Sequence, residues 1–190
     1  SQTGHGPKSW SLAAARANLG MVRMQAGRPA QALEVFQGTA ADIGADQPMV
    51  RRFLGNNMYY ADALISAGRA AEASPLLERV AERRVALFGA DHPDTAEARG
   101  MLAVAQAESG GRQDPMPAFR QAVPVLLART SRSQAEDAGE ASVGHEGRRR
   151  LVLESYIGHL TGGGGGDEAV AEAFRAADSV RSQVVQKSLT

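Results

Sequence analysis

Hydrophobic residues recur every three or four positions between residues 9 and 26, which is the spacing of one face of a helix. The apolar positions of this stretch are Leu12, Ala15, Leu19, Val22 and Ala26. Gly27 follows them, and glycine is the residue that most easily adopts the left-handed conformation ending a helix. Pro29 then opens a second apolar stretch that runs through Phe36 to Ile43. The pattern therefore predicts two helices joined by a short glycine turn.

This predicted pair of helices recurs along the chain with an offset of about 41 residues. Residues 26–32 read Ala-Gly-Arg-Pro-Ala-Gln-Ala, and residues 67–73 read Ala-Gly-Arg-Ala-Ala-Glu-Ala. A second match, at a slightly longer offset, relates residues 44–48 to residues 89–93 through a shared Gly-Ala-Asp-x-Pro. Because two separate segments match, the repetition is not a consequence of alanine-rich composition alone. We expect three helix pairs within residues 7–128.

The repeated unit resembles the tetratricopeptide repeat (TPR), a helix-turn-helix motif whose copies stack into a superhelix. In that family small residues let the paired helices approach, a glycine occupies the turn, and a bulky side chain fills the second helix. The matching small residues are Gly20, Ala32, Ala61 and Ala73, the turn glycines are Gly27, Gly68 and Gly110, and the fillers are Phe36, Leu77 and Phe119. Residues 87–95, at the junction before the third pair, are similar to the kinesin-light-chain subtype. The resemblance implies an all-α fold, a TPR-like right-handed superhelix of antiparallel helix pairs with about seven or eight helices.

Some positions depart from the family pattern. Arg16, Asn57 and Arg99 stand where the first helix often carries a large aromatic residue. Pro115 stands where the third pair should carry a small residue, which leaves the turn geometry of that pair open.

The chain changes character after residue 128. Residues 129–147 are polar and rich in Ser, Glu, Gly and Ala, which predicts an extended or partly ordered linker. Residues 148–190 resemble a degenerate fourth helix pair with a Gly-rich break at residues 162–166. In this pair Gly158 takes the small-residue position and Phe174 takes the place of the filler.

The last part of the chain is also similar to a second pattern. Residues 172–189 resemble the helix that leads from helical repeats into the caspase-like CHAT peptidase domain of bacterial repeat-peptidase proteins. This resemblance implies that a catalytic domain lies downstream of Thr190.

Charge and cysteine content exclude several classes of protein. The chain balances 21 basic against 21 acidic side chains, so its net charge gives no general reason to bind nucleic acid or an anionic membrane. It has no cysteine, which excludes disulfides, thiolate metal sites and a cysteine nucleophile within these residues. Its apolar runs are short, so we expect no membrane span and a cytoplasmic location.

The residues that carry catalysis in other proteins form no recognisable site here. No two of the four histidines have the spacing of a metal-binding pair; His92 is expected to hydrogen-bond the turn before Pro93, and His145 to be exposed. Asp94 or Thr95 is expected to cap the helix that follows. The basic run at residues 148–150 and the carboxylates on the helices are expected to be solvated. We therefore expect no metal, no cofactor and no enzymatic activity within this chain.

The remaining candidate for function is the concave face, which the first helices of successive repeats line in TPR arrays. The resemblance assigns eleven residues to this groove: Asn18, Met21, Met24, Gln25, Met58, Tyr59, Asp62, Ile65, Met101, Val104 and Glu108. Methionine is flexible and polarizable, so a methionine-rich groove can repack around different apolar side chains, although methionine at helical spacing also suits a core. The two carboxylates lack a basic neighbour in the groove, which favours an apolar or mildly basic segment over an acidic peptide.

We therefore expect a protein-protein interaction scaffold that binds a peptide segment or a neighbouring domain in its groove. The alternative is the regulatory or sensing repeat region of a TPR-caspase-like (CHAT) peptidase. Self-association, through the groove or through apolar surfaces at the ends of the array, is a third possibility.

Overall fold

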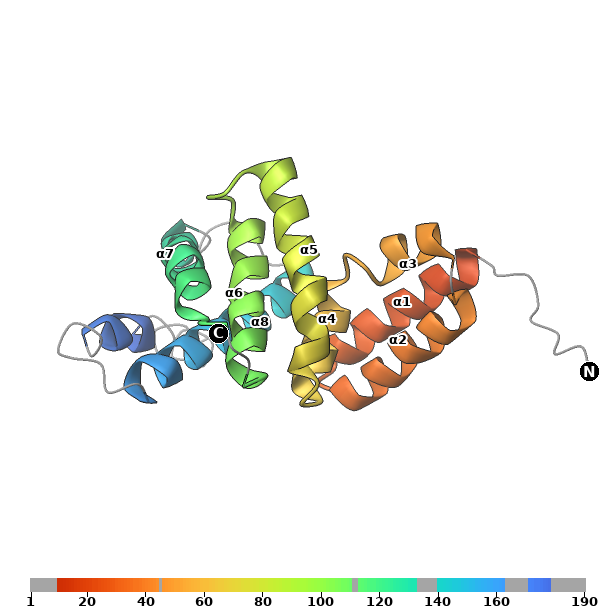
Figure 1. Ribbon diagram of the computed structural model, residues 1–190, viewed down its shortest axis with the longest axis horizontal. Coiled ribbons are helices and arrows are strands. Elements are labelled where there is room, and N and C mark those ends of the chain that lie inside the picture. The colour runs from red at the N-terminus through yellow and green to blue at the C-terminus, as the bar shows by residue number, and fades with distance from the viewer. Residues whose placement is uncertain (1–9, 45, 111–112, 133–139, 163–170, 179–190) are drawn as a thin grey trace, which may run out of the picture. The chain divides into compact units, whose positions relative to one another are not determined.

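A computed structural model describes residues 10–44, 46–110, 113–132, 140–162 and 171–178 (Figure 1). All regular secondary structure in these ranges is helical, as the repeat pattern predicts. The chain divides into two compact units, residues 1–80 and residues 81–190. None of the helices in the described ranges is long and apolar enough to cross a bilayer.

The first unit begins with α1 (Trp10–Gln25) and α2 (Pro29–Ile43), which pack against each other (Figure 1). Two shorter helices follow, α3 (Gln47–Phe53) and α4 (Met58–Ser66), and α4 packs on both α1 and α2. The next helix, α5 (Ala70–Phe88), spans the division between the two units. The predicted helix pair with its glycine turn is therefore confirmed in α1 and α2.

The turns between paired helices share one geometry. Gly27, Gly68 and Gly110 have φ angles of 69°, 71° and 60°, the left-handed region that glycine adopts without strain. At the first turn the backbone N–H of Gly27 donates to Met24 (3.0 Å) and that of Arg28 donates to Arg23 (2.9 Å). The second turn repeats the same pair of hydrogen bonds one repeat later. The prediction that these glycines occupy the turns is confirmed.

Small residues let the first two helices approach closely. A Cβ atom added to Gly20 of α1 would lie 2.5 Å from the ring of Phe36 on α2, so only glycine fits there. Phe36 is fully buried and its ring lies 5.3 Å from that of Tyr60 on α4. Because α1 presents its small residues Ala13, Ala17 and Gly20 to the interior, Leu12, Leu19 and Val22 remain exposed.

The first helix of the second repeat is interrupted, which the sequence pattern does not predict. Helix α3 ends at Phe53 and α4 begins at Met58, with Asn57 between them as an N-cap. The Asn57 side-chain oxygen accepts hydrogen bonds from the backbone N–H groups of Tyr59 (3.0 Å) and Tyr60 (3.2 Å), and its amide nitrogen donates to the carbonyl of Phe53 (3.0 Å). Asparagine competes for backbone hydrogen bonds in this way, and therefore breaks a helix more readily than it continues one.

The second unit contains the C-terminal part of α5, then α6 (Pro93–Glu108), α7 (Met116–Arg132) and α8 (Glu140–Gly162), and a short helix over residues 171–178. Helices α6 and α7 form a pair, and α8 packs on both of them. The filler position of this pair is confirmed, since Phe119 of α7 is fully buried against the ring of Tyr156 on α8.

The N-terminus of α6 corrects one expectation and confirms another. Neither Asp94 nor Thr95 caps α6, because both lie within its first turn and His92 is the N-cap. The ring Nδ1 of His92 accepts a hydrogen bond from the backbone N–H of Asp94 (3.2 Å), which is the turn contact expected of this histidine. The Thr95 hydroxyl instead donates to the carbonyl of Gly89 (2.8 Å) and is buried.

The C-terminal part differs from the predicted linker and fourth pair. Helix α7 continues to Arg132 and α8 already begins at Glu140, so helices occupy both ends of the stretch expected to be a linker. Gly158 is exposed with no atom near enough to require a glycine, so it does not serve as the small residue of a helix crossing. Phe174 is 73% exposed because its helix buries Ala173 and Ala176 instead. Residues 163–166 of the glycine run lie outside the described ranges.

Candidate protein-binding surfaces

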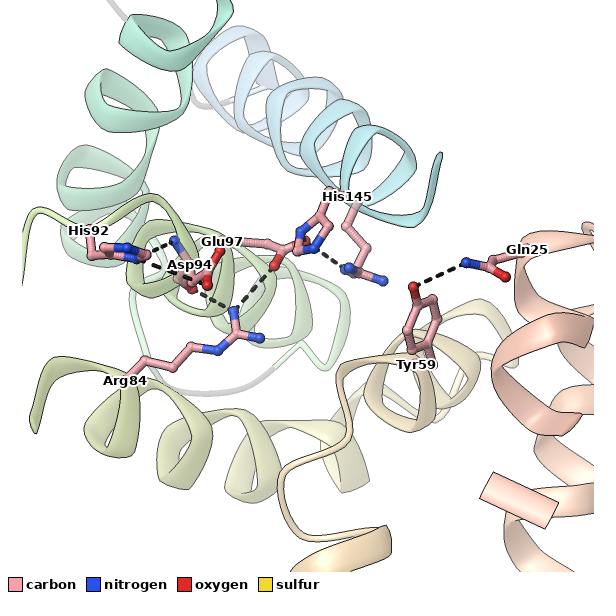
Figure 2. A network of polar contacts seen from close by, with 8 residues as sticks. Gln25, Tyr59, Arg84, His92, Asp94, Glu97 and His145 are labelled. Carbon is pink, nitrogen blue, oxygen red and sulfur yellow. Dashed lines mark hydrogen bonds and ion pairs between the residues drawn. The ribbon is translucent and has the colours of Figure 1, made fainter. Parts of the chain in front are cut away.

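Six of the predicted groove residues lie together on α1 and α4 in the first unit, and we call them the α1–α4 surface. They are Asn18, Met21, Met24, Gln25, Tyr59 and Asp62. Asn18 is exposed and the other five are half-buried. The Gln25 amide nitrogen lies 3.4 Å from the Tyr59 hydroxyl and joins the two helices across this surface (Figure 2). These side chains therefore keep solvent-accessible area on two neighbouring helices.

Four of the predicted groove residues are wrong as contact residues, because the structure buries them. Met58 and Ile65 lie seven positions apart on α4, on the side that also buries Ala61. Met101 and Val104 lie on α6, where they have no exposed surface. All four belong to the core instead, and for the two methionines this is the role that methionine at helical spacing often has. Glu108, at the end of α6, is exposed and lies in the second unit.

The second unit contains a buried group of charges that the sequence analysis missed. We call Arg84, Glu97, His145 and Arg148 the Glu97 cluster (Figure 2). Glu97 on α6 is 3% exposed, and its Oε1 accepts hydrogen bonds from Arg148 Nε (2.8 Å) and from His145 Nδ1 (2.9 Å), both on α8. Its Oε2 lies 3.2 Å from Arg84 Nη1 on α5. The cluster thus joins three helices through one carboxylate.

The environment of Glu97 keeps this carboxylate ionised. Burial alone would raise its pKa, but the hydrogen bond from His145 and the charge of Arg148 outweigh burial and lower the pKa to about 2. An ionised carboxylate can only accept hydrogen bonds, so His145 Nδ1 carries the hydrogen of their contact. Since the pKa lies far below neutrality, Glu97 is a poor proton acceptor for general-base catalysis at neutral pH.

A metal site is a weaker explanation for why these side chains lie together. One ligand atom each from Asp94, Glu97 and His145 lies within 4.8 Å of the others, which brings three donors together. However, guanidinium groups of Arg84 and Arg148 contact both oxygens of Glu97, and their positive charges oppose a cation at this position. The donor set is therefore better explained as a buried ion-pair network.

The sequence gives only a faint signal for this cluster. His145 and Arg148 were expected to be solvated, yet His145 is half-buried and Arg148 is 2% exposed. A spacing of three places both side chains on one face of α8. Glu97 stands among residues that fit a close helix contact, Ala96, Ala98 and Gly100, and that setting is unusual for a solvated glutamate.

Comparison with known proteins agrees with this architecture. Residues 55–128 match the model of the tetratricopeptide repeat family, a segment that includes α4, α5, α6 and most of α7. No curated protein matches the chain. The helical architecture and the family match together define an all-α, TPR-like fold. Repeats of this family are non-catalytic scaffolds that generally mediate interactions between proteins.

Proposed function

We propose that this protein binds a peptide segment or a neighbouring domain of a protein partner through the α1–α4 surface. The observation that carries the proposal is that six of the residues expected to line the groove retain exposed area on two adjacent helices. Two of the six are methionines, whose unbranched side chains adapt to different apolar partners. Asn18 adds both a donor and an acceptor for the backbone of a bound peptide.

The charge on the α1–α4 surface favours an apolar or mildly basic partner. The two arginines of α1 make contacts with α2, since Arg16 pairs with Asp42 and Arg23 Nη1 donates to the carbonyl of Gln31 (3.1 Å). The α1–α4 surface itself carries Asp62 and no basic residue. The negative charge of Asp62 attracts lysine or arginine and disfavours an acidic peptide.

Selection from a displayed library of random peptides would test this function. We expect the wild-type chain to enrich peptides that combine apolar residues with lysine or arginine. Met21→Glu should abolish their binding, because it adds a charge to the apolar part of the surface. Ala41→Glu adds the same charge to an exposed position of α2 and should leave binding unchanged. If the selected peptides bind a folded Met21→Glu variant as well as wild type, the α1–α4 surface is not the binding site.

The alternative function is that of a regulatory repeat region of a caspase-like CHAT peptidase. Its support is the resemblance of residues 172–189, of which the described part, residues 172–178, is helical. A longer reading frame that encodes a histidine and cysteine dyad after Thr190 would favour this alternative, and a frame without one would favour the scaffold.

A cytoplasmic location is part of the proposal. Fractionation of cells that express a tagged copy would test it.

A further inference from the structure

One face of α6 receives α8 through two contacts of different chemistry. Glu97 accepts the hydrogen bonds of His145 and Arg148, and one turn further along α6 Gly100 lies against Val152. The three α8 residues are spaced as neighbours on one helix face. This face of α6 therefore contacts a helix that carries a cation on one turn and a β-branched residue on the next.

The polar contact selects for arginine. Arg148 is 2% exposed and donates from Nε to a carboxylate that is itself buried, so neither charge is solvated. A helix that brought an apolar side chain to this position would leave the Glu97 charge without Arg148 as its partner, which is strongly unfavourable in a protein interior. Lysine, a point charge without a planar fork, would also fit the position less well.

The apolar contact depends on the absence of a side chain at Gly100. A Cβ atom there would lie 2.7 Å from one methyl group of Val152 and 2.9 Å from the other, closer than real Cβ contacts allow. The glycine thus provides a recess that a valine fills. Together with Glu97 it gives this face two separate features for recognising a helix.

The part of α8 that reaches Glu97 is intrinsically a weak helix. Gly144 and Gly147 flank His145, and glycine is the poorest helix former apart from proline. Gly147 is exposed, and no atom near it requires a glycine. The C-terminal part of α8 is held differently, because Val152, Leu153, Tyr156 and Leu160 are all buried. In the N-terminal part, His145 and Arg148 join α8 to α6 through Glu97.

We propose that the α6 face formed by Glu97 and Gly100 is a helix-binding site, that residues 144–152 of α8 occupy it in cis, and that an arginine-bearing helix of a partner protein replaces them. The inference rests on the proposed function, since it assigns a second protein-binding site to the same chain. The partner helix presents arginine to Glu97 and a β-branched residue, one turn further on, to Gly100. The weak helix in α8 keeps the cis occupant replaceable.

Hydrogen exchange of the full chain tests the weak cis occupancy. We expect the amides of residues 145–150 to exchange faster than those of residues 152–156. Gly147→Ala strengthens the helix without touching Glu97 and should slow the exchange of residues 145–150 about five-fold. Equal protection along α8 in the wild type, or no response to Gly147→Ala, would overturn the proposal.

A labelled peptide with the sequence of residues 140–162 tests replacement in trans. It should bind the full chain carrying Arg148→Gln, whose cis helix is weakened, at least ten-fold more tightly than it binds the Gly147→Ala chain. The same peptide carrying Arg148→Gln should not bind. If the Arg148→Gln chain does not fold, the Arg148→Lys chain replaces it, because lysine weakens the contact of α8 with Glu97 less than glutamine does. Absence of binding to every folded variant would overturn this inference alone, because binding of library peptides that depends on Met21 would still support the proposed function.

Discussion

Glu97 remains charged inside the second unit because its carboxylate is surrounded by hydrogen-bond donors from two other helices. Burying a carboxylate costs solvation free energy, and here the contacts with His145 and Arg148 more than offset that cost, since the pKa falls rather than rises. A single residue that contacts side chains of α5 and α8 thereby makes stability depend on pH.

The chain should lose stability in acid as Glu97 is protonated. Its pKa in the folded protein is about 2, below the ordinary value of 4.5, so its contribution is fully present above pH 4.5 and is lost as the pH falls toward 2. Urea denaturation at a series of pH values between 5 and 2 measures this loss. Glu97→Gln should be less stable than wild type at pH 7, by about 3 kcal/mol or more, because it removes the carboxylate charge that pairs with buried Arg148.

The variant also serves as the control for the pH effect. Glu97→Gln cannot titrate at this position, so its stability should decline less steeply over the same pH range. Parallel pH profiles of the two proteins would show that other carboxylates cause the acid sensitivity.

Some features of the helices and their connections can be predicted from neighbouring residues in the sequence, and others cannot. The glycine turns were predictable because a turn is set by a few adjacent residues, and Gly27 and Gly68 adopt the expected left-handed conformation. The break before α4 is equally local, but the helical spacing of the apolar residues concealed the capping role of Asn57. The Glu97 cluster was not predictable as a cluster, because the spacing of His145 and Arg148 places them on one face of α8 but does not say that this face packs against Glu97 on α6.

Asn57→Ala should destabilise the first unit by about 1 kcal/mol, because α4 loses the acceptor for two backbone N–H groups at its N-terminus. Asn57→Asp keeps that acceptor and should retain most of the stability. Urea denaturation of both variants, followed by circular dichroism, measures the difference. Equal losses in the two variants would show that the amide hydrogen bond to Phe53, rather than the cap, is the stabilising contact.

Over the whole molecule, equivalent helices differ in which of their faces is covered. Helices α1 and α6 are both 16 residues long, and on α6 the positions equivalent to Leu12 and Val22 of α1 are Thr95 and Ala105, which are buried. On α1 the apolar stripe of Leu12, Leu19 and Val22 is exposed, with each side chain between 43% and 53% accessible. A contiguous apolar stripe in contact with water is a site for association with another protein surface.

We expect the isolated chain to self-associate through this stripe on α1. Light scattering should show an average mass that rises with concentration, and Leu19→Lys with Val22→Lys should keep the chain monomeric. Leu87→Lys, at a position on α5 that is 60% exposed, is the matched control and should associate like wild type. A wild-type chain that stays monomeric at high concentration would contradict the expectation.

Two ring pairs in the structure have the same geometry although the chain between their rings differs in length. Phe36 and Tyr60 in the first unit, and Phe119 and Tyr156 in the second, each have centroids 5.3 Å apart and planes inclined by 45°. The same ring contact therefore accompanies the step from one helix pair to the next helix in both units, although the connecting chain differs in length. We therefore expect that a reporter sequence inserted between α7 and α8 would leave the contact of Phe119 with Tyr156 unchanged.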